Sequence, residues 1–97
     1  MMSEALEIRH VFVEGLVQGV GYRDFARRTA LRLSVRGWAR NRTDGTVEVF
    51  AVASAARLEA FLAALRQGPG LVSTLRDAGS DGLDGEASQT FLIRPTF

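Results

Sequence analysis

The first third of the chain passes from a strand pattern to a helix pattern. In residues 8–14, Val11 and Val13 alternate with polar and aromatic residues, which predicts a strand with one buried face. From Tyr22 to Leu33, apolar residues recur at helical spacing and arginines occupy the other faces, which predicts an amphipathic helix. The residues between these two elements form a connecting loop.

A hairpin and a second helix are predicted next. Residues 35–41 and 46–53 have strand patterns, and the Asp44–Gly45 pair between them is a strong turn signal. Ser54 is a suitable N-cap for the helix that follows. The apolar face of that helix, at the spacing of a buried stripe, consists of Leu58, Phe61, Leu62 and Leu65. We assign these four residues to the core.

The pattern is weaker in the last third. Residues 71–78 make a poor strand, residues 79–88 a flexible connection, and residues 90–94 a convincing last strand. The order βαββαβ is typical of a ferredoxin-like α/β (α+β) sandwich, with two helices on one face of a mainly antiparallel sheet. Because a helix joins the first two strands, these strands run in the same direction and end at one edge. We therefore expect Arg23 and Asn41 on one rim.

Composition narrows the possible chemistry. The 97 residues suit one domain, 1–97, with its own core. With no cysteine and one histidine, His10, the chain lacks thiolate nucleophiles and the ligands of cysteine or multi-histidine metal sites. All 12 basic residues are arginine, which excludes a lysine Schiff base. No apolar run suggests a signal or a membrane span, so we expect a cytoplasmic protein that does not bind membranes.

Charge is unevenly placed although the net charge is only +1. In residues 23–42, seven arginines accompany a single acid, Asp24. Two interpretations fit this stretch equally: a solvated helix face, or a basin that attracts an anionic ligand. For Arg40 and Arg42 the same alternatives are steering of anions and ordinary surface charge.

The loop before the first helix suggests what such an anion contacts. Gly15, Gly19 and Gly21 allow positive φ, so the loop can turn several backbone N–H groups inward. Such a concavity binds anions, and the helix N-terminus adds unpaired N–H groups and a positive dipole end. Arg23, in the first turn, points back toward the loop and can hold a phosphate with two hydrogen bonds. By itself the signal is weak, and it matches neither a P-loop nor a Rossmann fingerprint.

The segment GLVQGVGYR, followed by ALRLSVRGWARN and then DGTVEV, resembles the acylphosphatase family. Those enzymes show a glycine, then V-Q-G-V-G-[FY]-R, an L-x-G-W-[VA]-R-N segment and D-G-T-V-E. The whole chain fits in length and order, and the sharp match runs from Gly15 to Val49. Ser34 departs from the family because it replaces the glycine that ends the first helix. A non-glycine residue in left-handed geometry costs about 1–2 kcal/mol, so we expect a different local backbone there.

The resemblance implies an enzyme that hydrolyses the carboxyl–phosphate anhydride of acyl phosphates to carboxylate and inorganic phosphate, without metal or other cofactor. It implies two catalytic residues, Arg23 to bind the phosphate and Asn41 to position the attacking water. The implied phosphate-binding backbone consists of Gln18, Gly19, Val20, Gly21 and Tyr22, followed by Arg23. The expected partner is a small-molecule acyl phosphate, with no nucleic acid and no membrane, and the protein is expected to be a monomer.

Other residues near the motif have simpler explanations. The Gln18 side chain either caps the loop or contacts substrate, and the sequence does not decide between these roles. Asp24 is a helix-start carboxylate favoured by the dipole. We expect His10 to be structural and Trp38 to serve packing rather than ligand stacking.

Two other functions fit the sequence less well. A non-catalytic anion-binding or regulatory module could share the fold, but it would not need both Arg23 and Asn41. An RNA-binding domain of this class would need exposed aromatic residues on the central strands, and Phe12 and Phe50 are too few.

Overall fold

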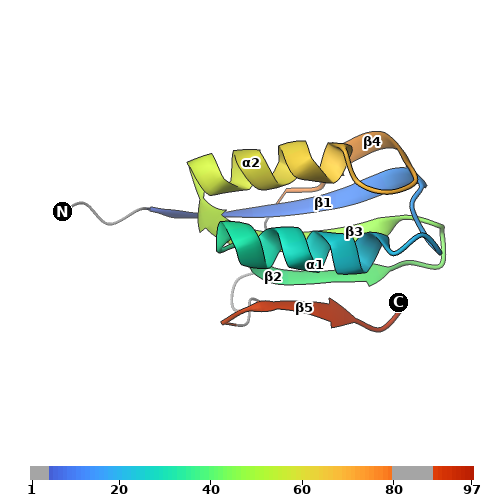
Figure 1. Ribbon diagram of the computed structural model, residues 1–97, viewed down its shortest axis with the longest axis horizontal. Helices are drawn as coiled ribbons and strands as arrows, with labels where there is room; N and C mark the ends of the chain where they lie inside the picture. Colours follow the sequence, from blue (N-terminus) through green and yellow to red (C-terminus); the bar gives the residue numbers. More distant parts are fainter. Residues whose placement is uncertain (1–4, 80–88) are drawn as a thin grey trace.

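A five-stranded sheet and two helices make up the part of the chain that the computed structural model describes, residues 5–79 and 89–97. The elements in chain order are β1 (Leu6–Leu16), α1 (Tyr22–Leu33), β2 (Arg36–Asn41), β3 (Val47–Ser54), α2 (Ala55–Arg66), β4 (Leu71–Asp77) and β5 (Phe91–Arg94). Both helices lie side by side on one face of the sheet, as the sequence predicted (Figure 1). The other face carries no helix of the described residues.

The strand order is β4-β1-β3-β2-β5, with only the β2–β5 pair parallel among the described strands. The ferredoxin-like arrangement is confirmed with one correction. Residues 71–77 form a complete edge strand in addition to the last strand, so the order is βαββαββ. The poor pattern of this segment has a physical reason: β4 pairs only with β1 and exposes most of its side chains. The predicted connection 79–88 lies outside the described residues, apart from Gly79.

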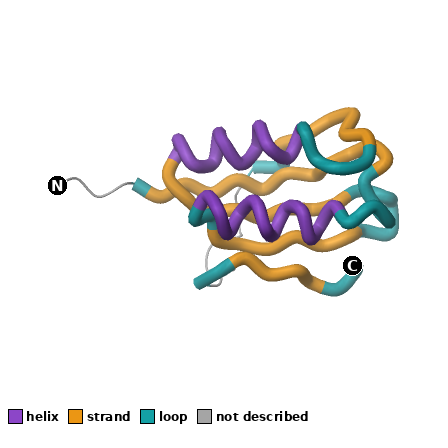
Figure 2. Tube along the Cα trace, in the orientation of Figure 1, coloured by secondary structure: helices purple, strands orange, loops and turns teal. Residues whose placement is uncertain are grey.

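The direction of the strands determines where the loops meet. Because β3 is antiparallel to both β1 and β2, the latter two run in the same direction, as predicted. The loop after β1 and the turn after β2 therefore lie at the same end of the molecule (Figure 2). The last described residues, after β5, end there as well.

The main core lies between the helices and the sheet. β3 is buried along its whole length, and Val47, Val49 and Ala51 face the helices. The second helix contributes Leu58, Phe61 and Leu65, which are all at most 1% exposed and confirm three of the four predicted core positions. Leu62 is half-buried and packs against the same core. Burial of each such side chain stabilises the fold by about 1.5–3 kcal/mol.

The end of α1 contradicts one expectation. Ser34 takes the left-handed conformation itself, with φ 58° and ψ 42°, so the backbone is the one that a glycine would adopt. Its N–H bonds to the carbonyls of Ala30 and Leu31, and the N–H of Val35 donates to Ala30 at 2.8 Å. These bonds and the burial of Val35, 2% exposed, offset the cost of the strained residue.

Candidate functional site

The loop between β1 and α1 forms an open cradle at the start of the helix. Gly19 and Gly21 have φ of 77° and 78°, and a Cβ atom at either position would meet nothing within 4 Å. The glycines are therefore required for backbone conformation and not for space. Gly21 is the N-cap and has no side chain to satisfy the first-turn N–H groups. These donors, at the positive end of the helix dipole, are suited to an anion.

Gln18 fastens this cradle to the hairpin between β2 and β3. Its side-chain Nε2 donates to the carbonyl of Arg42 at 2.7 Å and to the carbonyl of Thr46 at 2.8 Å. An amide nitrogen has two hydrogens, so both are in use. Of the two roles that the sequence left open for this side chain, the structure favours the structural one.

Tyr22 anchors the first turn of α1. Its ring is 1% exposed, and its hydroxyl donates to the carbonyl of Leu65 in α2 at 2.6 Å. Burial raises the pKa of the Tyr22 phenol, which stays protonated. Its ring is therefore a core residue, and only its backbone can belong to an anion site.

Arg23 follows in the first turn and is half-buried. Its Nη1 lies 3.4 Å from the carbonyl of Arg94 at the end of β5, a long hydrogen bond that ties the guanidinium to the last strand. A guanidinium has five N–H donors, so this contact leaves others for a ligand.

Asn41 is the last residue of β2 and is also half-buried. Its backbone carbonyl accepts a hydrogen bond from the N–H of Phe97 at 3.0 Å. Within the described part of the chain, its side-chain amide makes no hydrogen bond. An uncommitted amide supplies both a donor and an acceptor to whatever enters the adjoining space.

These groups surround one cleft of about 180 Å³, several times the ~30 Å³ that a water molecule occupies in the liquid. Its lining consists of Val17, Gly19, Gly21, Tyr22, Arg23, Asp24, Asn41 and Ile93. Arg23 and Asn41 thus share one rim, as the strand directions predicted. Two residues of the predicted cradle, Gln18 and Val20, are absent from the lining. The Val20 side chain is instead 44% exposed.

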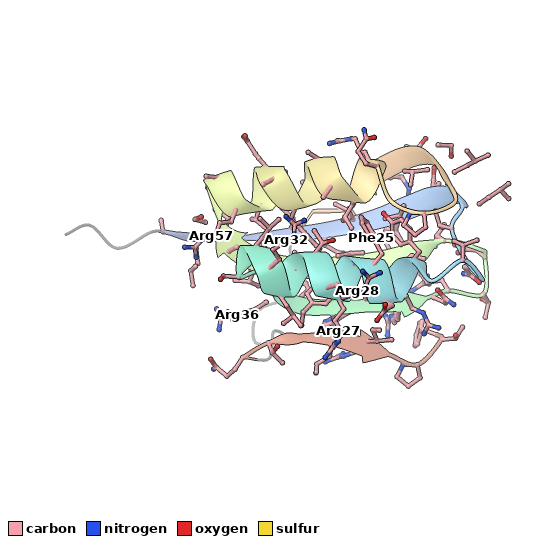
Figure 3. The ribbon with its side chains drawn as sticks, viewed as in Figure 1. Phe25, Arg27, Arg28, Arg32, Arg36 and Arg57 are labelled. Atoms are coloured by element: carbon pink, nitrogen blue, oxygen red, sulfur yellow. The ribbon has the colours of Figure 1, made fainter. Side chains whose placement is uncertain are left out.

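Positive charge is present in the cleft at Arg23 and continues along α1. Arg27, Arg28 and Arg32 are exposed and project from the helix that begins there (Figure 3). Asp24, on the rim of the cleft, bonds to Arg28 at 2.9 Å, as expected of a structural helix-start carboxylate. The local excess of cations favours the approach of an anionic ligand.

The sequence analysis missed Glu48, a carboxylate on the helix-free face of the sheet. Its side chain is 5% exposed and contacts His10, Arg40 and Arg42. His10 is therefore structural, as expected, whereas the two arginines are neither isolated surface charges nor dedicated to anion steering. The sequence did contain a signal for this cluster. Glu48 lies in an otherwise apolar strand, and a buried carboxylate requires charged or hydrogen-bonding partners.

Two further properties concern the described residues as a whole. They contain no group of three or more histidine, cysteine, aspartate or glutamate side chains that could hold a metal ion. Neither described helix is long and apolar enough to cross a bilayer.

The fold and the cleft define a ferredoxin-like α+β protein with a cleft at a helix N-terminus. The sequence model of the Acylphosphatase family matches residues 9–91. The chain is 42% identical over 88 residues to the acylphosphatase of Alcanivorax borkumensis, an alignment covering 88% of this chain and 96% of that protein. It is 51% identical over 84 residues to the acylphosphatase of Leuconostoc mesenteroides, covering 87% and 93%.

Solved structures agree with these relatives. The crystal structure of acylphosphatase from Bacillus subtilis superimposes with a TM-score of 0.82 at 33% identity, over 93% of this chain and 99% of that one. The chain belongs to the acylphosphatase family.

Proposed function

We propose that this protein hydrolyses acyl phosphates to a carboxylate and inorganic phosphate in the cleft between the glycine loop and the end of β2. The observation that carries the proposal is the meeting of Arg23, an uncommitted Asn41 amide and the glycine cradle around one space of about 180 Å³. Membership of the acylphosphatase family gives that space its chemistry.

The cradle and Arg23 bind the phosphoryl group of the substrate. The backbone N–H groups of residues 18–22 and the helix dipole receive the phosphoryl oxygens, and the guanidinium adds charge-assisted hydrogen bonds. These contacts are already oriented before the substrate arrives, because Gln18 holds the loop and Arg94 holds the guanidinium. Little reorganisation is then needed as charge moves in the transition state.

Asn41 orients the water that attacks phosphorus. A neutral amide cannot accept the proton of that water, so a phosphoryl oxygen of the substrate takes it. The acyl carboxylate leaves readily without a strong general acid, because the bond that breaks is an activated anhydride. Positioning and electrostatic stabilisation therefore supply most of the rate enhancement, and the reaction needs no metal or other cofactor.

The test separates the two roles by replacing Asn41. Asn41→Ala removes the group that orients water and leaves the cradle intact, so kcat for benzoyl phosphate should fall about 10²–10³-fold. The affinity for inorganic phosphate should stay within about twofold, because the ground-state contacts remain. Asn41→Asp should also be slow, since a carboxylate repels the phosphoryl group. Turnover rates and phosphate titrations of the purified variants provide the measurements.

Thr43→Ala is the matched control. Thr43 is exposed in the same hairpin and does not line the cleft, so its loss should leave both quantities unchanged. An Asn41→Ala protein that keeps its kcat and loses phosphate binding would reverse the assigned roles. A wild-type protein that binds phosphate without turning over any of benzoyl, acetyl and carbamoyl phosphate would instead be a non-catalytic anion-binding module.

A further inference from the structure

Glu48 forms a buried ionic cluster on the face of the sheet opposite the helices. One carboxylate oxygen, Oε1, accepts from Nε of Arg40 at 2.8 Å and from Nη1 of Arg42 at 2.9 Å. The other, Oε2, lies 2.6 Å from Nε2 of His10. Burial would raise the pKa of Glu48, but the hydrogen bonds from these three partners outweigh it and hold the pKa below its usual value.

The two arginines of this cluster are the residues on either side of Asn41. Cross-strand register places Arg40 opposite Glu48 and Asn41 opposite Val47. Side chains alternate along a strand, so Arg40 points to the helix-free face while Asn41 points to the cleft. A single carboxylate therefore holds the chain immediately before and immediately after Asn41, from the reverse side of the sheet.

Further contacts connect the cluster to the rest of the site. The backbone carbonyl of Arg42 is one of the two acceptors of Gln18, so the same residue also fastens the cradle. The ring of Phe97 lies 4.2 Å from the Arg40 guanidinium and 5.1 Å from that of Arg42, while its N–H bonds to the carbonyl of Asn41. The position of the Asn41 backbone is thus determined from three directions.

From this geometry we infer that Glu48 is a positioning residue for the reaction. It never meets the substrate, and it acts by holding Arg40 and Arg42 so that the Asn41 amide faces the bound phosphoryl group. The inference rests on the role of Asn41 in the proposed function. Its consequence is that catalysis depends on a carboxylate on the face of the sheet that the substrate does not contact.

Glu48→Gln tests the inference with little change of shape. The amide keeps an acceptor for one arginine but loses the charge that holds both, so Asn41 should shift. Because a misplacement of about 1 Å can cost on the order of 10²-fold in rate, kcat for benzoyl phosphate should fall about 10- to 100-fold. The affinity for inorganic phosphate should change by less than about twofold, because Arg23 and the cradle do not contact Glu48 and Gln18 keeps its second anchor, the carbonyl of Thr46.

A matched control lies on the same face. Glu14 also pairs with an arginine, Arg76, at 3.3 Å, but it is on β1, away from Asn41. Glu14→Gln should therefore leave kcat unchanged. A second pair, Arg42→Met with the control Arg76→Met, covers the case in which Glu48→Gln does not fold. Arg42→Met should reproduce the loss of kcat, since it releases the residue after Asn41 while Arg40 and His10 stay paired with Glu48.

Two readouts distinguish positioning from general stability. All assays are run well below the unfolding temperature of the least stable variant. The first readout is NMR: the ¹⁵N resonances of the Asn41 backbone and side chain should move in Glu48→Gln but not in Glu14→Gln. The second readout is a double variant. The double variant Asn41→Ala/Glu48→Gln should be no slower than Asn41→Ala, because both changes remove the same contribution.

Three results would overturn the inference. The first is a folded Glu48→Gln protein that has the same kcat as Glu14→Gln. The second is a Glu48→Gln protein that loses kcat and phosphate affinity in parallel. The third is a double variant whose loss of kcat is the product of the losses in Asn41→Ala and Glu48→Gln. If Asn41→Ala has a low kcat while Glu48→Gln and Arg42→Met keep the wild-type kcat, only this inference is overturned. Asn41→Ala at the wild-type rate would remove the proposed role of Asn41 as well.

Discussion

At the scale of single residues, the site separates groups that line the cleft from groups that hold them in place. Arg23 and Asn41 line the cleft, whereas Gln18 and Tyr22, from the same motif, direct their side chains to the hairpin and to the core. The division is physical, because a group that must stay still while charge moves needs its own hydrogen-bond partners. The nine-residue motif therefore contains residues that anchor the site as well as residues that line the cleft.

Arg23 is predicted to matter in both binding and turnover. In the proposed mechanism its guanidinium contacts the phosphoryl group in the ground state and in the transition state, so Arg23→Ala should weaken phosphate binding and lower kcat together. Arg23→Lys should restore little, since an ammonium ion lacks the planar fork that binds two oxygens at once. Phosphate titration and benzoyl phosphate kinetics measure the two effects.

Arg27→Ala is the control for Arg23, since Arg27 is an exposed arginine one turn further along α1 and outside the cleft. It should change phosphate affinity only slightly and lose even that effect at high salt. Near-normal rates and phosphate inhibition in Arg23→Ala would show that the loop is not the site.

The sequence was sufficient to place residues whose position follows from a helix start or from the direction of a strand. Arg23 was predicted from a helix start, and the placement of Asn41 from the direction of two strands. Sequence reasoning missed Glu48 and did not decide the role of Gln18. His10 lies 38 positions from Glu48, the two acceptors of Gln18 lie 24 and 28 positions away, and Arg40 and Arg42 meet Glu48 only across the hairpin. Such pairings depend on strand register, which a hydrophobic pattern specifies only approximately.

At the scale of elements, the hydrophobic pattern predicted the elements that bury one face and underestimated the edge strand that stays exposed. α1 was predicted from Tyr22 to Leu33, the bounds that the structure shows, because one face of it must pack on the sheet. β4 was rated poor because an edge strand that pairs on one side buries few side chains. Backbone hydrogen bonds hold it in place, and a pattern of side chains does not report them.

The end of α1 provides a stability prediction. Ser34→Gly should raise the free energy of unfolding by about 0.5–1 kcal/mol, the relief of left-handed strain less the added freedom of the unfolded chain. A rise of a few degrees in Tm is expected for a chain of this size. Thermal unfolding followed by circular dichroism measures it, and kcat should not change because the cleft is at the opposite end of the helix.

Ser73→Gly is the comparison for Ser34→Gly. Ser73 is exposed in β4 and has an ordinary negative φ, so glycine there should lower stability by about 0.5–1 kcal/mol. A Ser34→Gly protein less stable than the wild type would mean that the serine side chain stabilises this turn by more than the strain costs.

At the scale of the whole molecule, the chemistry is limited by what the chain contains. Because the chain has one histidine and no cysteine, we predict hydrolysis without a metal ion. Benzoyl phosphate hydrolysis should therefore persist, within about twofold, after exhaustive dialysis against a chelator. Loss of the rate in chelator and its return with a divalent cation would contradict the mechanism.

β5 follows the other strands in the chain, which bears on the order in which the site can assemble during synthesis. Arg23 is held by a carbonyl 71 positions further along the chain, and the carbonyl of Asn41 by the N–H of Phe97. Arg94 and Phe97 leave the ribosome after β1 to β4, which can already pair by then. Contacts of such long sequence separation also form late and slowly during folding. We infer that a nascent chain folds most of its sheet while inert and gains hydrolytic activity only when the last strand docks beside β2.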